Sequence, residues 1–210
     1  MEAFEQFVAV AMEMEGLVVS PAVKFPVRKK TNKESHDEFQ THGYEVDLVG
    51  ARADRLVLAS VKSFLGSRGV QAKQVAESGL YRLLNDMEVR EGVVAEAARR
   101  YGYQPERIQL RLYVGKFAGK NGADETAIRA WCARQAVGAG AIEVYGLQTL
   151  IDKVRQVAAS RTYVNNPVVV AVKALAAAGL VNLQSEVGVP DVSKVEDDED
   201  DEPEETDEER

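Results

Sequence analysis

One stretch of the chain, YEVDLVGARADRLVLASVKSF, constrains the fold more than any other. It contains two β-like runs, residues 44–51 and 55–64, joined by a tight turn. Their length and the short connection predict an antiparallel hairpin. Both runs are mostly apolar, yet Glu45 and Asp47 lie in the first and Lys62 lies near the end of the second. Three charges on otherwise apolar strands require an explanation.

Side chains alternate between the two faces of a strand, and this alternation predicts where the charges lie. Glu45 and Asp47 are expected on one face of the hairpin, and Val46 and Leu48 on the other. Packing the apolar faces together would then bring Asp47 to the same side as two residues of the second strand, Ser60 and Lys62.

Such a group of charges has a recognisable chemistry. Two neighbouring carboxylates resist ionisation unless a cation lies between them. A hard divalent ion such as Mg²⁺ provides that compensation, with oxygen ligands and several retained waters. A nearby lysine can orient a water molecule or stabilise negative charge that develops on a phosphate.

The rest of the chain supplies alternating helices and strands. Apolar periodicity, glycine and proline predict these elements: a helix over 2–15, an edge strand over 23–27, a polar loop over 28–43, helices over 71–86 and 88–101, a strand over 107–117, a helix over 124–137, a strand over 141–145, and helices over 147–160 and 167–179. This order predicts an α/β fold with a mixed sheet, antiparallel at first and parallel later.

The pattern of a helix, a strand, E-x-D-L-V, a short turn and an apolar strand ending in x-x-K resembles the core of the PD-(D/E)XK nuclease superfamily. The matching residues are 45–49 and 60–62, and by element order the resemblance covers roughly residues 1–150. It implies a restriction-endonuclease-like αβββαβ core and a Mg²⁺-dependent (or Mn²⁺-dependent) enzyme that hydrolyses DNA. We expect C-terminal helices over 151–183 and a disordered acidic tail over 184–210 to follow this core.

The resemblance assigns roles to individual positions. The family's aspartate matches Asp47 and its lysine matches Lys62. The first helix of the family often contributes a glutamate, for which Glu5 is the best candidate, with Glu2 and Glu13 as alternatives.

One position departs from the family pattern. The family usually has a carboxylate two residues before the lysine, where this chain has Ser60. One group of restriction enzymes has Ser-x-Lys there and takes a glutamate from the following helix, which makes Glu77 the candidate. Gln74 and Tyr81 would share its helix face, and related exonucleases have a glutamine and a tyrosine lining the site.

Two hypotheses follow from these residues. In the first, the chain is a nuclease in which Asp47 holds the metal ion with either Glu77 or Glu45. In the second, Ser60 marks the loss of the metal site, and the fold is a catalytically inactive module that binds nucleic acid or a protein partner. Asp47 and Lys62 would then form a structural ion pair between neighbouring strands. A purely structural assembly protein is a third class, but it does not explain the strand charges.

Charge is distributed unevenly along the chain. Residues 196–210 contain 12 acidic residues and one arginine, a net −11, so the net −8 of the whole chain leaves +3 for the remainder. The tail has no apolar content to bury, and its acidity suggests either a solubilising role or competition with nucleic acid. A basic run with the composition of a DNA-contacting loop precedes the hairpin: Arg28, Lys29, Lys30 and Lys33.

Composition also gives expectations for the location and the contacts of the protein. The single cysteine, Cys132, fits a reducing compartment, and we expect a cytoplasmic protein. No apolar run approaches the ~18 residues of a membrane span. The last helix is apolar nearly all round, which suggests that it is buried or contacts a second copy or another protein.

Overall fold

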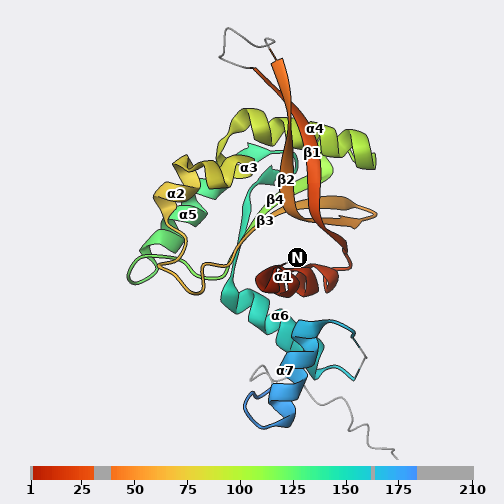
Figure 1. The fold of residues 1–210 in the computed structure, drawn as a ribbon, viewed down its shortest axis with the longest axis vertical. Helices are drawn as coiled ribbons and strands as arrows, with labels where there is room; N and C mark the ends of the chain where they lie inside the picture. Colours follow the sequence, from red (N-terminus) through yellow and green to blue (C-terminus); the bar gives the residue numbers. More distant parts are fainter. Residues whose placement is uncertain (1, 31–38, 162–163, 184–210) are drawn as a thin grey trace, which may run out of the picture.

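A mixed five-stranded sheet forms the centre of the molecule (Figure 1). The computed structural model describes residues 2–30, 39–161 and 164–183. The strands lie in the order β1-β2-β3-β4-β7. Their bounds are β1 (Val18–Lys30), β2 (Phe39–Arg52), β3 (Arg55–Lys62), β4 (Ile108–Val114) and β7 (Glu143–Gly146), and a separate small pair is formed by β5 (Ala136–Val137) and β6 (Gly140–Ala141).

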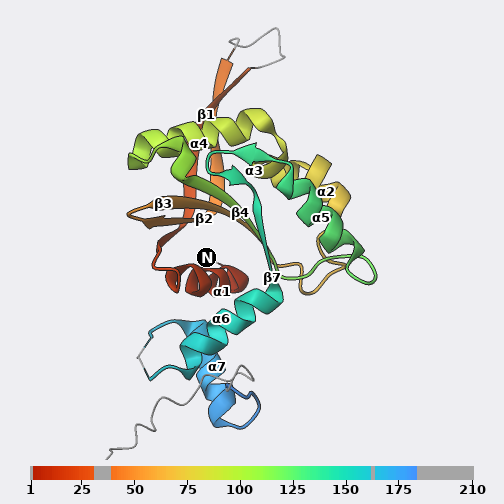
Figure 2. The same ribbon diagram turned by 180° about the vertical axis from the view of Figure 1, so that it is seen from behind.

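Helices cover both faces of this sheet (Figure 2). One face packs against α2 (Ala72–Glu77), α3 (Arg82–Asn85), α4 (Met87–Tyr101) and α5 (Ala123–Ala133). The other face packs against α1 (Ala3–Glu13) and α6 (Leu147–Ala159), and α7 (Pro167–Ala177) lies against α6 and α1. Two 3-10 turns complete the described elements, η1 (Gly79–Tyr81) and η2 (Pro105–Arg107).

The strand directions confirm the predicted mixed sheet. β1 pairs with β2, and β2 with β3, in antiparallel registers. β3, β4 and β7 are parallel to one another. The chain is therefore an α/β protein whose hairpin connects directly to a parallel half. None of the described helices is both long and apolar enough to cross a membrane.

The prediction that Val46 and Leu48 share a face is wrong. Val46 packs in the core beneath α4, whereas Leu48 packs in the core beneath α1. The alternation of side chains between the two faces changes at Asp47. There the pairing between β1 and β2 skips one residue pair, and the opposing residue Ala22 has a φ of +51°. A left-handed residue interrupts regular pleating, so both strands change faces together at this point.

The predicted helix over 71–86 is wrong as a single element. It divides into α2, η1 and α3, because Ser78 is extended with φ −81° and ψ 142°. The Ser78 side chain accepts a hydrogen bond from the N–H of Leu80, a local contact that competes with helix continuation. As a result Tyr81 does not share a helix with Gln74 and Glu77, and the apolar side chain of Leu80 is 67% exposed.

The polar segment over 28–43 was predicted to be a loop, but its described parts belong to strands. β1 continues to Lys30 and β2 begins at Phe39, so the two strands form a long ribbon that projects beyond the body of the sheet (Figure 1). Long ribbons accept polar residues on their exposed face, which hides the strand from a hydrophobic pattern. The predicted edge position of β1 is confirmed.

The C-terminal helices largely follow their predictions. α6 passes without a break through residue 150, where the core was predicted to end. α7 begins at Pro167, and the Asn166 side chain accepts a hydrogen bond from the N–H of Val168. α5 ends at Ala133, four residues before its predicted end. The acidic segment over 184–210 lies outside the described residues.

The loops after β3 and β4, residues 63–71 and 115–122, lie against each other and are called the paired loops below. Val70 donates its N–H to the Lys116 carbonyl at 2.8 Å, and Ala118 donates to the Val70 carbonyl at 2.9 Å. The contact is close enough that a Cβ on Gly69 would meet the Phe117 carbonyl carbon at 2.6 Å. Gly69 also has a φ of +96°, so only glycine fits here without strain.

Gly69→Ala is therefore expected to destabilise the protein by about 2–3 kcal/mol, because it combines backbone overlap with an unfavourable φ. Gly66→Ala is the matched control in the same loop, since Gly66 has open space around its Cα and no positive φ. Urea denaturation of both variants measures the difference. Equal free energies of unfolding would show that the two loops do not pack as described.

Candidate functional site

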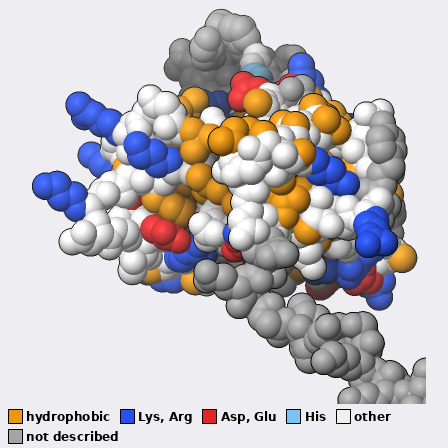
Figure 3. Space-filling view, turned by 90° about the horizontal axis from the view of Figure 1, so that it is seen from below, with side chains coloured by type: hydrophobic (Ala, Val, Ile, Leu, Met, Phe, Trp, Pro, Cys, Tyr) orange, Lys and Arg blue, Asp and Glu red, His pale blue; other side chains and the backbone are white. Residues whose placement is uncertain are grey.

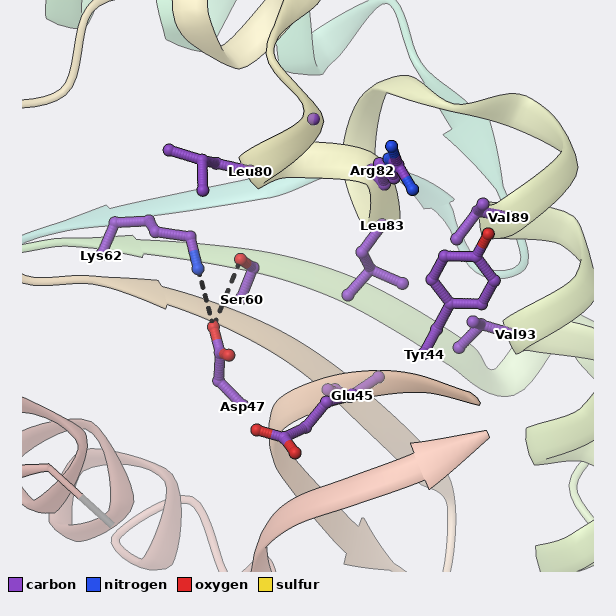
Figure 4. A pocket seen from close by; sticks show the side chains of 12 residues that line it. Tyr44, Glu45, Asp47, Ser60, Lys62, Leu80, Arg82, Leu83, Val89 and Val93 are labelled. Carbon is purple, nitrogen blue, oxygen red and sulfur yellow. Dashed lines mark hydrogen bonds and ion pairs between the residues drawn. The ribbon is translucent and has the colours of Figure 1, made fainter. Parts of the chain in front are cut away.

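Asp47 and Lys62 meet across β2 and β3 (Figure 4). The Asp47 Oδ2 atom accepts from the Lys62 Nζ at 3.1 Å and from the Val61 N–H at 2.6 Å. The Ser60 hydroxyl lies 3.4 Å from the same oxygen. The predicted convergence of Asp47, Ser60 and Lys62 on one side is therefore correct.

The strand geometry explains why these residues converge. Leu48↔Ala59 is the last described pair between β2 and β3, and the two strands separate beyond it. The N–H of Val61 has no strand partner on that side and bonds instead to the Asp47 carboxylate. Because the alternation of side chains changes at Asp47, its side chain points toward β3 and not into the apolar core on either face of the sheet.

A cavity of about 290 Å³ opens where the strands separate. Its polar lining includes two carboxylates and two cations: Glu45, Asp47, Lys62 and Arg82. Side chains from η1, α3 and α4 form an apolar wall: Leu80, Leu83, Val89 and Val93. Arg82 is a cavity residue that the sequence did not single out, because its position depends on the break of the helix at Ser78.

Lys62 is held between the carboxylate and an aromatic ring. Its side chain is 19% exposed, and its Nζ lies 6.0 Å from the centroid of the Tyr81 ring. Tyr81 itself is buried, and burial raises the pKa of its hydroxyl to about 12. A buried tyrosine does not offer its face to a ligand, so Tyr81 acts on the site through Lys62.

Glu77 does not line the cavity. Its side chain is 66% exposed, and its carboxylate lies 4.0 Å from the Lys73 ammonium one turn away on α2. Gln74 is also absent from the described cavity lining. Of the two predicted partners of Asp47 in a metal site, the structure thus does not place Glu77 at the cavity.

Glu5 has a local role in the structure. Its carboxylate accepts from the N–H of Glu2, in a capping box that begins α1. Such a contact satisfies one of the free N–H groups at a helix start. Neither Glu5, Glu2 nor Glu13 belongs to the described cavity lining.

Glu45 is the second carboxylate that the structure places at the cavity. Its side chain is 51% exposed and lies 3.8 Å from the Lys24 ammonium, a weak surface contact. The described residues contain no cluster of three or more metal-ligating side chains. Asp47 and Glu45 are oxygen donors of the kind that a hard ion takes, but two carboxylates alone would leave most of its shell to oxygens from elsewhere.

The basic run of β1 divides between the two faces of the ribbon. Lys29 faces α4, where it bonds to Asp86 at 2.6 Å and lies 3.5 Å from Glu88, and the bond to Asp86 raises the pKa of Lys29. Arg28 lies on the exposed face, with its guanidinium 4.5 Å from the Phe39 ring centroid. Lys30 donates its N–H to Glu88, and Lys33 lies outside the described residues. Lys29 therefore ties β1 to α4, and its nucleic-acid contact stays a prediction.

A second charged cluster lies on the opposite face of the sheet. Arg111 in β4 is 2% exposed and contacts Glu15 at 2.8 Å and Glu143 at 2.9 Å. Lys153 from α6 also bonds to Glu15. Burial alone would raise the pKa of Glu15, but the bonds from Lys153 and Arg111 outweigh it and hold that pKa below its usual value. The cluster ties α1 and α6 to β4 and β7.

Comparison with known proteins adds no relative to this description: the chain matches no family model, no curated protein and no solved structure.

Proposed function

We propose that this chain is a metal-dependent nuclease that hydrolyses phosphodiester bonds of DNA. The observation that carries the proposal is the meeting of Asp47 and Lys62 at the point where β2 and β3 separate, on a cavity shared with Glu45. The order of one helix, an antiparallel hairpin and a parallel crossover supports a restriction-endonuclease-like αβββαβ core.

The chemistry assigns a task to each side chain. Asp47 and Glu45 would hold Mg²⁺ or Mn²⁺, which supplies charge neutralisation and a more acidic bound water. Lys62, fixed by Asp47 and Tyr81, donates hydrogen bonds to the attacking water or to a phosphate oxygen. Arg82 lines the same cavity, and its guanidinium can donate two hydrogen bonds to one phosphate.

Lys62→Met is expected to lower DNA cleavage by at least about a hundredfold, because it removes a positioned donor from the site. The wild type and the variant are compared with Mn²⁺, and with a chelator, on single-stranded, duplex and branched DNA of the same sequence. Metal-dependent cleavage by the wild type that the variant lacks would support the proposal. Wild-type cleavage that survives in Lys62→Met at an unchanged rate would contradict the assigned role.

A second candidate function is a catalytically inactive nuclease-fold module. The exposed position of Glu77 favours it, because the expected replacement for the missing carboxylate at Ser60 is not at the site. Exposed apolar side chains of the C-terminal segment, Val170, Leu175 and Leu180, favour a protein partner, and Figure 3 shows hydrophobic side chains gathered on the face seen from below. In that case the wild type would cleave none of the DNA forms with either metal.

A further inference from the structure

The paired loops begin where Lys62 ends. β3 and β4 are parallel, so both of their carboxyl ends lie at one edge of the sheet. The first residue of the second loop, Gly115, donates its N–H to the Lys62 carbonyl at 2.9 Å. The backbone of the candidate catalytic lysine is therefore directly bonded to the paired loops, and the loops extend the surface next to the cavity.

The charged side chains of the two loops themselves are all positive. Residues 63–71 and 115–122 contain three cations and no aspartate or glutamate: Arg68, Lys116 and Lys120. The nearest acidic residue in sequence, Asp124, accepts from the Ala72 N–H at 2.8 Å. In Figure 3, Lys and Arg side chains project on the left, the side on which Figure 1 places α2 and α5.

Hydrogen bonds hold the backbones of the two loops against each other. The two backbone bonds through Val70 join the loops, and Val70 and Phe117 form an isolated parallel bridge. The Lys116 ammonium donates to the Ser67 carbonyl at 2.7 Å and spans the two loops. Arg68 and Lys120 are exposed, and within the described part of the chain neither forms an ion pair. A rigid support lowers the entropy cost of binding a charged ligand.

We propose that the paired loops bind the phosphate backbone of the nucleic acid that enters the cavity, with Arg68 and Lys120 as the contacting cations. The inference rests on the proposed function for the identity of the ligand. A polyanion fits because the two loops present separate cations and contain no carboxylate, and because Lys62 and Arg82 add two cations at the cavity. Phosphate contacts of this kind position a nucleic acid without reading its sequence.

The double variant Arg68→Ser/Lys120→Ser tests the proposal through the salt dependence of binding. Each phosphate contact with duplex DNA contributes about 0.9 to the slope of log K against log[salt], so the loss of two contacts is expected to reduce that slope by about 2. Fluorescence anisotropy with labelled duplex and single-stranded DNA, in the full-length chain with a chelator present, measures it without requiring cleavage.

Arg107→Ser/Arg134→Ser is the matched control. It removes the same number of positive charges from two exposed positions, Arg107 at the end of η2 and Arg134 directly after α5. Neither position belongs to the paired loops. The control is expected to retain the wild-type slope. Equal slopes for the two double variants, or a wild type that binds no DNA, would overturn the inference.

The nuclease proposal and the paired-loop proposal can be tested independently of each other. Hydrolysis of bis(p-nitrophenyl) phosphate with Mn²⁺ reports on the catalytic site without a nucleic-acid backbone. If the slope falls but the wild type hydrolyses neither this ester nor DNA, the loops bind nucleic acid and the nuclease proposal is wrong. If hydrolysis occurs and the slope is unchanged, the nuclease proposal stands and the paired loops are not the binding surface.

Discussion

Asp47→Asn is expected to fold and to lose at least about a hundredfold in the rate of DNA cleavage. Asparagine keeps an oxygen that can accept the Val61 N–H, so the local strand geometry survives. It removes the negative charge that orients Lys62 and that would hold the metal ion. Single-turnover cleavage with Mn²⁺, at protein concentrations above the DNA concentration, measures the chemical rate.

The matched variant for this experiment is Asp54→Asn. Asp54 also pairs with a cation, Arg52 at 2.7 Å, but its side chain is 61% exposed in the turn between β2 and β3, and it does not line the cavity. This variant is expected to cleave at the wild-type rate. Wild-type cleavage by folded Asp47→Asn would remove Asp47 from the catalytic machinery.

Arg111→Met is expected to lower the free energy of unfolding by about 2–3 kcal/mol, because it removes a fully buried guanidinium and leaves the buried Tyr113 hydroxyl without its donor. Arg111 is one of the largest fully buried side chains, and its guanidinium also bonds to the Tyr113 hydroxyl at 3.1 Å. Glu15 retains Lys153, so the loss falls mainly on Glu143 and on the packing around Tyr113. Urea denaturation followed by circular dichroism measures the change.

Arg99→Met is the control for that loss. Arg99 makes two short bonds to Glu96, but its side chain is 73% exposed, so solvent screens its ion pair and the variant is expected to unfold close to the wild type. A large difference between the two variants would establish that the Arg111 cluster fastens α1 and α6 to the sheet. A loss of less than about 1 kcal/mol for Arg111→Met would contradict that role.

The hairpin and its charged residues were predictable because their signals are local. The tight turn, the apolar runs and the position of Lys62 at the end of β3 all lie within about twenty residues. Alternation within β3 correctly placed Ser60 and Lys62 together. The mixed sheet followed from the order of the elements, since a short connection forces antiparallel pairing and a helical crossover permits parallel pairing.

Two local events escaped the sequence pattern. The left-handed conformation of Ala22 changes the phase of β2 at Asp47, and alanine carries no preference that announces it. The extended Ser78 interrupts a segment whose apolar spacing is helical, and this break separates Tyr81 from Glu77. Both events alter the site, since they decide which side chains reach the cavity.

Other residues of functional interest were missed because their partners are far apart in the chain. Arg111 and Glu15 are separated by 96 positions, and no local motif joins them. The loops that carry Arg68 and Lys120 come together only because β3 and β4 are neighbours in the sheet. Arg82 reaches the cavity only because the helix breaks. Sequence alone identified the basic run of β1, but not that Lys29 turns toward Asp86.

The central claim is that Asp47 belongs to a metal site, and calorimetric titration with Mn²⁺ tests it most directly. Wild type and Asp47→Asn are titrated with and without excess thymidine 5′-monophosphate, which offers the phosphate oxygens of a substrate. The acidic segment over 196–210 is common to both proteins, so its own metal binding cancels in the comparison. We expect one Mn²⁺ site in the wild type that Asp47→Asn lacks. Identical titrations of the two proteins, with the nucleotide present, would contradict the metal site.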